Sequence, residues 1–231
     1  MGRDNWKVQR TRHTPWGAVA LVLLTGIALM RNGVDVPDGP PQPVAAARLD
    51  APRDLGDTGD VGDTEEAGDD RLADEPVRML PYAPAARVSV PAIKVDAPIV
   101  DVGLDQDGWI AAPPPQDPNL AGWYQNGISP GQRGTAVLVG HVDNLSGPAV
   151  FYGLGALTKG EHVEVTRYDG RVAVFEIYGV EVFSKADFPG PRVYGDTGYA
   201  ELRVITCGGG YSKAGGYDGN VVVFARLTET R

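Results

Sequence analysis

The side chains best suited to covalent chemistry in this sequence are one thiol and one imidazole. The only cysteine, Cys207, ends the strand-like run 202–207 and is followed by three glycines. A lone thiol cannot form a disulfide within the chain, so its reactivity is the first question. Most single cysteines are small buried packing residues, and from the residues alone this alternative stays open.

The imidazole is His141, one of three histidines. It follows the apolar run 136–139 and a glycine, so it also stands where a strand ends, whereas His162 follows a polar segment and is expected at the surface. Two strand ends can present their side chains to one edge cleft. If Cys207 and His141 meet, they can share a proton and produce the thiolate that attacks carbonyl carbons.

The N-terminal residues predict export and membrane attachment. Basic residues in 1–14 precede the apolar segment 15–31, an order that keeps the N-terminus in the cytoplasm and exports the rest. The apolar run is shorter than the roughly 20 residues of an upright spanning helix. It is therefore a short anchor or the core of a cleaved signal peptide. Because the small residues near its end make a poor cleavage site, we favour a single-pass anchor in the plasma membrane.

Residues 32–86 have the composition of a disordered tether. Prolines come first, and aspartates and glutamates separated by glycine and alanine follow. Such a segment has too little apolar surface to offset its ordering entropy. It also carries most of the net charge of −9, which argues against nucleic acid as a partner. A divalent-cation site is the alternative, but the diffuse carboxylates do not reproduce a calcium loop, so we expect no metal and no cofactor.

The remaining residues, 87–231, are predicted to form one mainly β domain. Short strand-like runs alternate with turn dipeptides such as Asp107-Gly108, long helical periodicity is absent, and 149–157 is the one short helix expected. This pattern of short strands and turns favours a closed barrel or a sandwich, with a hairpin at 167–171. The expected strands are 88–90, 97–102, 136–139, 162–167, 172–182, 201–206 and 220–227.

Several ordered motifs in this domain resemble the sortases, and most of all their class F group from actinobacteria. The resemblance spans essentially all of 87–231. The motifs are VPAIKVDAP at 90–98, LAGWY at 120–124, TAVLVGHVD at 135–143, GPAVFY at 147–152, AELRVITCGG at 200–209 and NVVVFA at 220–225.

The resemblance implies an eight-stranded β-barrel transpeptidase outside the plasma membrane. Its partners would be surface proteins with LPXTG-like C-terminal sorting signals and a cell-wall peptide amine. Cys207 would attack the Thr-Gly carbonyl and hold a thioacyl intermediate, while His141 would serve as general acid and base. Thr206, beside the thiol, is implied as a substrate-binding residue.

One residue implied by the resemblance is missing, namely an arginine about a dozen residues after the thiol. Removing an oxyanion donor typically costs about a hundred- to thousandfold in rate. We therefore expect another group to take its place at the substrate. This group is either a neutral donor from Asn220 or Tyr217 or a loop cation such as Arg192 or Lys213. Otherwise the chain is a catalytically weak homologue that binds sorting signals.

Two further alternatives are weaker. Arg226 lies six residues beyond Asn220, about 20 Å along a strand, which is too far for a simple replacement. A cysteine peptidase or amidase of the papain-like kind places its cysteine before its histidine in the chain, whereas His141 precedes Cys207 here.

Overall fold

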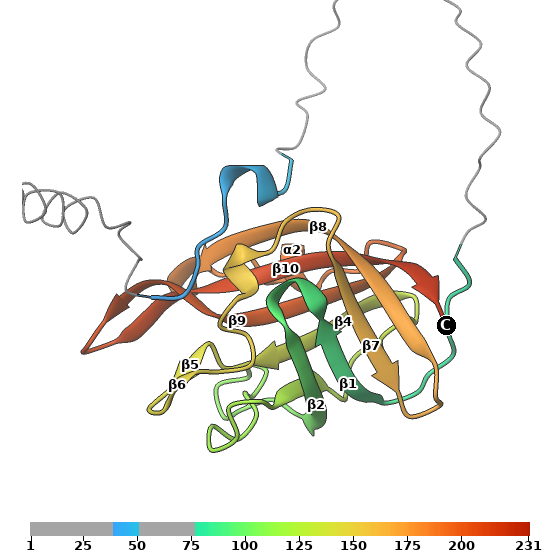
Figure 1. Ribbon diagram of the computed structural model, residues 1–231, viewed down its shortest axis with the longest axis horizontal. Helices are drawn as coiled ribbons and strands as arrows, with labels where there is room; N and C mark the ends of the chain where they lie inside the picture. Colours follow the sequence, from blue (N-terminus) through green and yellow to red (C-terminus); the bar gives the residue numbers. More distant parts are fainter. Residues whose placement is uncertain (1–38, 51–76) are drawn as a thin grey trace, which may run out of the picture. The chain divides into compact units, whose positions relative to one another are not determined.

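Eight strands close into a barrel within residues 39–50 and 77–231, the part of the chain described by the structure, a computed structural model. Around the barrel they follow the order β1-β2-β3-β4-β9-β10-β8-β7 (Figure 1). The predicted mainly β, closed-barrel fold is thereby confirmed. The strands are β1 (Ala85–Val90), β2 (Val95–Val102), β3 (Ala121–Tyr124), β4 (Gly134–Gly140), β7 (His162–Arg167), β8 (Val172–Ser184), β9 (Ala200–Ser212) and β10 (Gly216–Thr230).

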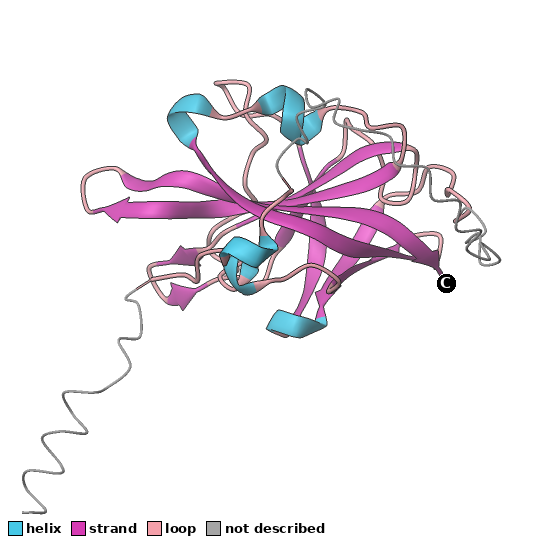
Figure 2. Cartoon of the chain, turned by 90° about the horizontal axis from the view of Figure 1, so that it is seen from above, coloured by secondary structure: helices cyan, strands magenta, loops and turns pink. Residues whose placement is uncertain are grey.

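The connections contain one small hairpin and only short helical turns, drawn in cyan in Figure 2. The helix expected over 149–157 is reduced to a single 3₁₀ turn of three residues, and the hairpin expected at 167–171 joins β7 to β8. The small hairpin is β5 (Asp143–Asn144) with β6 (Gly147–Pro148), and the turns are η1 (Ala45–Ala47), η2 (Pro91–Ile93), η3 (Leu154–Ala156), η4 (Lys185–Asp187) and α2 (Gly190–Tyr194).

Strands β4 and β9 are buried on both faces. In β4, Ala136 and Leu138 belong to the core cluster inside the barrel, whereas Val137 and Val139 belong to a second apolar cluster on the outer face. The two strands pair in parallel, with Val139 opposite Ile205. Parallel strands covered on both faces read as continuous apolar runs, which fits β4, whereas β9 carries the buried charged residues Glu201 and Arg203.

Residues 39–50 differ from the disordered tether that the sequence predicts for 32–86. Ala47 is fully buried within the core cluster, the Leu49 amide donates to Glu181 Oε1 at 3.1 Å, and the Tyr152 hydroxyl donates to the Gly39 carbonyl at 2.9 Å. The average composition of 32–86 is polar and acidic, and it hides the apolar side chains near the start of this segment. Figure 1 shows these residues, in blue, beside β8.

The end of the same predicted tether also joins the barrel. The Leu80 amide donates to the Gly131 carbonyl at 2.8 Å, and the buried Arg167 guanidinium donates to the carbonyls of Pro81 and Pro130. These contacts hold the residues that lead into β1 against the rest of the domain.

No helix within 39–50 and 77–231 is both long and apolar enough to cross a lipid bilayer. The anchor predicted at 15–31, the basic residues 1–14 and the acidic run of the predicted tether lie outside these ranges. Among the residues that are described, no group of three histidine, cysteine or acidic side chains is arranged to hold a metal ion.

Candidate active site

The parallel pairing of β4 with β9 brings His141 and Cys207 to the same end of two neighbouring strands. Each residue lies two positions beyond the last register pair, Val139 and Ile205. The Thr206 hydroxyl donates a 2.8 Å hydrogen bond to the Gly140 carbonyl, which extends the connection between the strands to the residues just before the pair. Neighbouring strands lie about 4.8 Å apart, so the backbones of the two residues are expected to lie close together.

Both side chains belong to the outer face of the barrel wall. Side chains alternate between the two faces of a strand, so Cys207 shares a face with Ile205, and His141 shares one with Val139. Ile205 and Val139 are both in the outer apolar cluster. Asn220 lies directly opposite Cys207 in the β9–β10 register and therefore joins the same face.

The His141 ring is held by the backbone. Its Nε2 lies 2.8 Å from the Pro113 carbonyl oxygen. Because a carbonyl oxygen only accepts hydrogen bonds, Nε2 carries the proton, and Nδ1 is the basic nitrogen of the neutral ring. No hydrogen bond joins His141 to Cys207 among the described side chains, and both residues are half-buried.

Cys207 and Asn220 open into a pocket of about 460 Å³. One wall is aromatic: Phe188 packs edge-on against Trp109, with ring centres 6.2 Å apart, and at a tilt against Tyr194, with ring centres 5.8 Å apart. A second pocket of about 370 Å³ shares Trp109, Ile110 and Tyr194 with the first. Together they form an apolar surface that begins at the thiol. The remaining residues that line the first pocket are Asp105, Ala112, Val139, Lys185 and Ile205.

Of the other predicted site residues, Thr206 and Tyr217 contact protein groups. Thr206 is buried and uses its hydroxyl on Gly140. The Tyr217 hydroxyl donates to Asp143 Oδ2 at 2.5 Å, which ties the β9–β10 hairpin to the hairpin that follows His141. Burial first, and then this hydrogen bond, raise the pKa of Tyr217, so the phenol stays a protonated donor at neutral pH.

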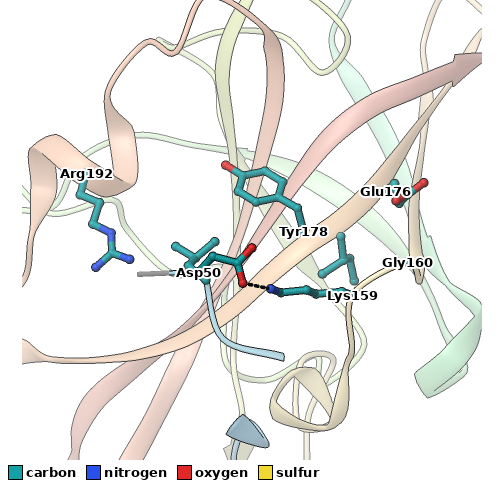
Figure 3. A pocket seen from close by; sticks show the side chains of 8 residues that line it. Asp50, Lys159, Gly160, Glu176, Tyr178 and Arg192 are labelled. Atoms are coloured by element: carbon teal, nitrogen blue, oxygen red, sulfur yellow. Dashed lines mark hydrogen bonds and ion pairs between the residues drawn. The ribbon is translucent and has the colours of Figure 1, made fainter. Parts of the chain in front are cut away.

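Arg192 lies in a different pocket. This pocket, of about 580 Å³, is lined by Asp50, Lys159 and Tyr178 among others, but by neither Cys207 nor His141 (Figure 3). The Arg192 guanidinium approaches Glu181 at 3.6 Å and stacks over the Phe183 ring at 5.4 Å. The loop-cation hypothesis is therefore not supported by the position of Arg192.

Two other cations from the sequence analysis are also elsewhere. Arg226 pairs with the buried Glu201 at 3.2 Å and stacks on Tyr199 at 4.0 Å. Lys213 is exposed in the turn between β9 and β10 and does not line the thiol pocket.

The cation that does line the pocket is Lys185, which the sequence analysis did not single out. It is the first residue of η4, directly after β8 ends at Ser184, and its Nζ donates to the Tyr217 carbonyl at 2.8 Å. In the sequence Lys185 reads as an ordinary surface lysine 22 positions before the thiol. Only the pairing of β8 with β10 brings it near Asn220.

A buried ionic network supports the wall of the pocket. Arg203 donates through Nε to the Val193 carbonyl in α2 at 3.0 Å and through Nη2 to Glu201 at 2.5 Å. Burial alone would raise the pKa of Glu201, but the hydrogen bond and charge of Arg203, with help from Tyr178, outweigh it and lower that pKa. The network therefore holds α2, and with it Tyr194, in place.

A closed barrel with a thiol and an imidazole at adjacent strand ends has the composition of a cysteine-dependent acyl-transfer site. The sequence comparison agrees with this class: the model of the Sortase domain family matches residues 88–228. That match covers more than half of the chain, so this chain belongs to the sortase family, whose members are generally cysteine transpeptidases. No curated protein sequence matches the chain.

Solved sortase structures resemble the chain at low identity. Sortase A from Listeria monocytogenes is 17% identical, with a TM-score of 0.47 over 65% of this chain and 90% of that one. The SrtA sortase from Actinomyces oris is 20% identical, with a TM-score of 0.49 over 69% of this chain and 89% of that one. Sortase A from Corynebacterium diphtheriae is 18% identical, with a TM-score of 0.48 over 64% of this chain and 62% of that one.

Proposed function

We propose that this chain is a class F-like sortase that cleaves LPXTG-like sorting signals and transfers the attached protein to a cell-wall amine. The observation that carries the proposal is the β4–β9 register, because Cys207 and His141 follow the ends of this pair in a chain of the sortase family. The family match and the motifs around both residues support the same reaction class.

In this proposal the Cys207 thiolate attacks the Thr-Gly carbonyl carbon of the substrate. The new S–C bond forms as the carbonyl π electrons move to oxygen, and the C–N bond then breaks as the carbonyl re-forms. Protonated His141 gives its proton to the departing glycine amine. The incoming amine loses a proton to His141 as it displaces the thiolate, which regenerates the enzyme.

The pocket beside Cys207 offers a recognition surface for the sorting signal. The aromatic wall of Trp109, Phe188 and Tyr194 suits apolar substrate residues such as leucine and proline, which gain about 25 cal/mol for each Å² of apolar surface removed from water. Asn220 adds an amide donor opposite the thiol. An extended peptide that starts at the thiol can therefore place its apolar side chains on this wall.

The proposal includes a location and two further partners. The order of basic and apolar residues in 1–31 supports a single-pass anchor in the plasma membrane, with the barrel on the outer side. There the partners are surface proteins with C-terminal sorting signals and a cell-wall peptide amine. Actinobacterial origin belongs to the same proposal, since it rests on the class F motifs.

A second candidate function is a sortase homologue that binds sorting signals and turns them over slowly. The observation that favours it is Asn220, a neutral residue, opposite the thiol in a stretch where the class F pattern has an arginine. Loss of a charged donor at this place is worth about a hundred- to thousandfold in rate.

The test is acyl-enzyme formation by the purified full chain in detergent. We expect a quenched Leu-Pro-x-Thr-Gly peptide library to yield a Cys207 thioester detectable by intact mass, released by hydroxylamine, and converted to an amide by a peptide amine. Cys207→Ala should abolish the adduct, and His141→Ala should slow both steps by about a hundred- to ten-thousandfold.

The outcomes separate the candidates. A slow adduct with tight peptide binding would favour the weak homologue. Turnover that survives in Cys207→Ala would overturn the mechanism for both.

A further inference from the structure

We propose that Lys185 supplies the positive charge at the substrate carbonyl, from the turn after β8 rather than from the segment of the missing arginine. This inference rests on the proposed transpeptidase function. It assigns a role to the first residue of η4, directly after β8, which the motifs around Cys207 do not include.

Strand register defines the position of Lys185 relative to the thiol. Cys207 lies opposite Asn220 in the β9–β10 pair, and Asn220 lies opposite Phe183 in the β10–β8 pair. The three side chains thus stand in one row on the outer face. Lys185 is two positions beyond Phe183, at the start of η4, and it lines the same pocket as Cys207 and Asn220.

The ammonium group of Lys185 is anchored but has donors to spare. Its Nζ donates to the Tyr217 carbonyl at 2.8 Å, a contact that holds the group at the start of β10. A lysine ammonium has three N–H donors, and this bond uses one. Because an ammonium acts as a point charge without a fixed fork, it can approach an oxyanion from the side of the pocket without an arginine's planar geometry.

The thiol pocket is lined by two charged side chains, Lys185 and Asp105, among the described residues. Lys185 is the only cation among the described residues that line the pocket. Asp105 also lines it, but its Oδ1 accepts the amides of Asp107 and Trp109 within its own turn. Asp218, which follows Tyr217, accepts the Gly210 amide at 2.7 Å. The positive charge in the pocket therefore comes from Lys185.

The proposed reaction needs a positive charge near the substrate carbonyl oxygen while the S–C bond forms. When the S–C bond forms, the carbonyl π electrons become a full negative charge on oxygen, and this charge disappears when the C–N bond breaks. Donors fixed in advance around that oxygen lower the barrier. We assign one donor to the Asn220 amide and the charge to Lys185, so that a neutral residue of β10 and a cation from the turn after β8 share the expected arginine's role.

The first test measures the electric field at the thiol and needs no substrate. The rate of Cys207 modification is compared for an anionic sulfonatoethyl and a cationic trimethylammonioethyl methanethiosulfonate. In Lys185→Met the ratio of anionic to cationic rates should fall roughly five- to tenfold, because the lost charge acts with opposite sign on the two reagents in a water-like medium. The matched control is Lys213→Met, an exposed lysine outside the pocket, which should leave the ratio unchanged.

The second test measures acylation by the sorting-signal peptide. Lys185→Met should slow acyl-enzyme formation about a hundred- to thousandfold, Lys185→Arg should keep most of the rate, and Asn220→Arg should restore it in the Lys185→Met background. An unchanged rate ratio in Lys185→Met, or an equal change in Lys213→Met, would overturn the inference. If the field effect is present but no peptide acylates the wild type, the proposed function fails instead, while the position of the cation stands.

Discussion

The Thr206 hydroxyl donates a 2.8 Å hydrogen bond to the carbonyl of Gly140, and these two residues immediately precede Cys207 and His141. The bond crosses from β9 to β4 at the end of their parallel pair. The residue next to the candidate nucleophile therefore fixes the backbone next to the candidate base, and the spacing of the two reactive side chains depends on a side chain that does not enter the pocket.

The first prediction concerns this bond. Thr206→Val keeps the volume but leaves the Gly140 carbonyl without its buried donor, so the free energy of unfolding should fall by about 1–3 kcal/mol. Urea denaturation measures the change. Thr228→Val, which removes a longer 3.4 Å bond to the Val174 carbonyl, is the matched control and should lose less. Equal losses in the two variants would show that the hydrogen bond from Thr206 to Gly140 contributes no more to the free energy of unfolding than the longer bond of Thr228.

The second prediction concerns the contact of residues 39–50 with the barrel. A Cβ at Gly155 would lie 1.9 Å from the Pro41 carbonyl oxygen, so Gly155→Ala should displace this segment. We expect faster amide exchange and earlier proteolytic cleavage within 39–50, with the β10 amides unchanged. Gly103→Ala is the control, because a Cβ there meets nothing within 4 Å. Protection of 39–50 equal to that of the wild type would contradict the packing described.

The third prediction concerns the pH dependence contributed by Glu201. Its pKa in the folded protein lies below the ordinary value of 4.5, so its contribution to stability is present above about pH 4.5 and is lost as the pH falls through the lower folded pKa. Glu201→Gln should cost about 3–5 kcal/mol at neutral pH, because Arg203 stays buried without its partner. The difference from the wild type should shrink on acidification.

Urea denaturation at a series of pH values measures this effect. Glu229→Gln serves as the control, since Glu229 pairs with Arg231 at the surface, where solvent screens the interaction, and little change is expected. A difference between Glu201→Gln and the wild type that is constant from neutral to acidic pH would exclude a charged Glu201 as the source.

The fourth prediction concerns the link between the two hairpins. Tyr217→Phe removes the donor to Asp143, so the hairpin of β5 and β6 should open more often. A loss of about 1.4 kcal/mol corresponds to about tenfold faster amide exchange in 143–148. Tyr211→Phe is the control, because Tyr211 packs beside Tyr217 but is 66% exposed. Equal amide exchange in the two variants would show that the hydrogen bond from Tyr217 to Asp143 does not hold the hairpin of β5 and β6 closed.

Much of the barrel was predictable because its strands carry local signals. The strand-like runs that end at Gly140 and Cys207 mark both sides of the candidate site, and the motif at 220–225 points to Asn220, which lies opposite Cys207 in the register. Strand β3 was not predicted, because the four residues Ala-Gly-Trp-Tyr contain no β-branched side chain and gain their stability from flanking strands.

The parts of the site that escaped prediction depend on pairing between distant segments. Lys185 lies near the thiol only because β8 and β9 both pair with β10, a relationship that no local pattern encodes. Arg192 is a candidate from sequence because it lies in the loop before the cysteine strand. Lys185 lies farther from Cys207 in sequence and carries no such local signal. The Arg192 guanidinium instead turns toward Glu181.

The parallel pairing of β4 with β9 also affects the order of events during folding. Parallel neighbours need a long crossover, and Gly140 and Thr206 are 66 residues apart in sequence. Closing so large a loop is a late and slow event in folding, because its entropy must be lost before the contacts form. A partly folded chain therefore lacks the pairing that brings Cys207 and His141 to the same end of the barrel, and under the proposed function acyl-enzyme formation can report when folding is complete.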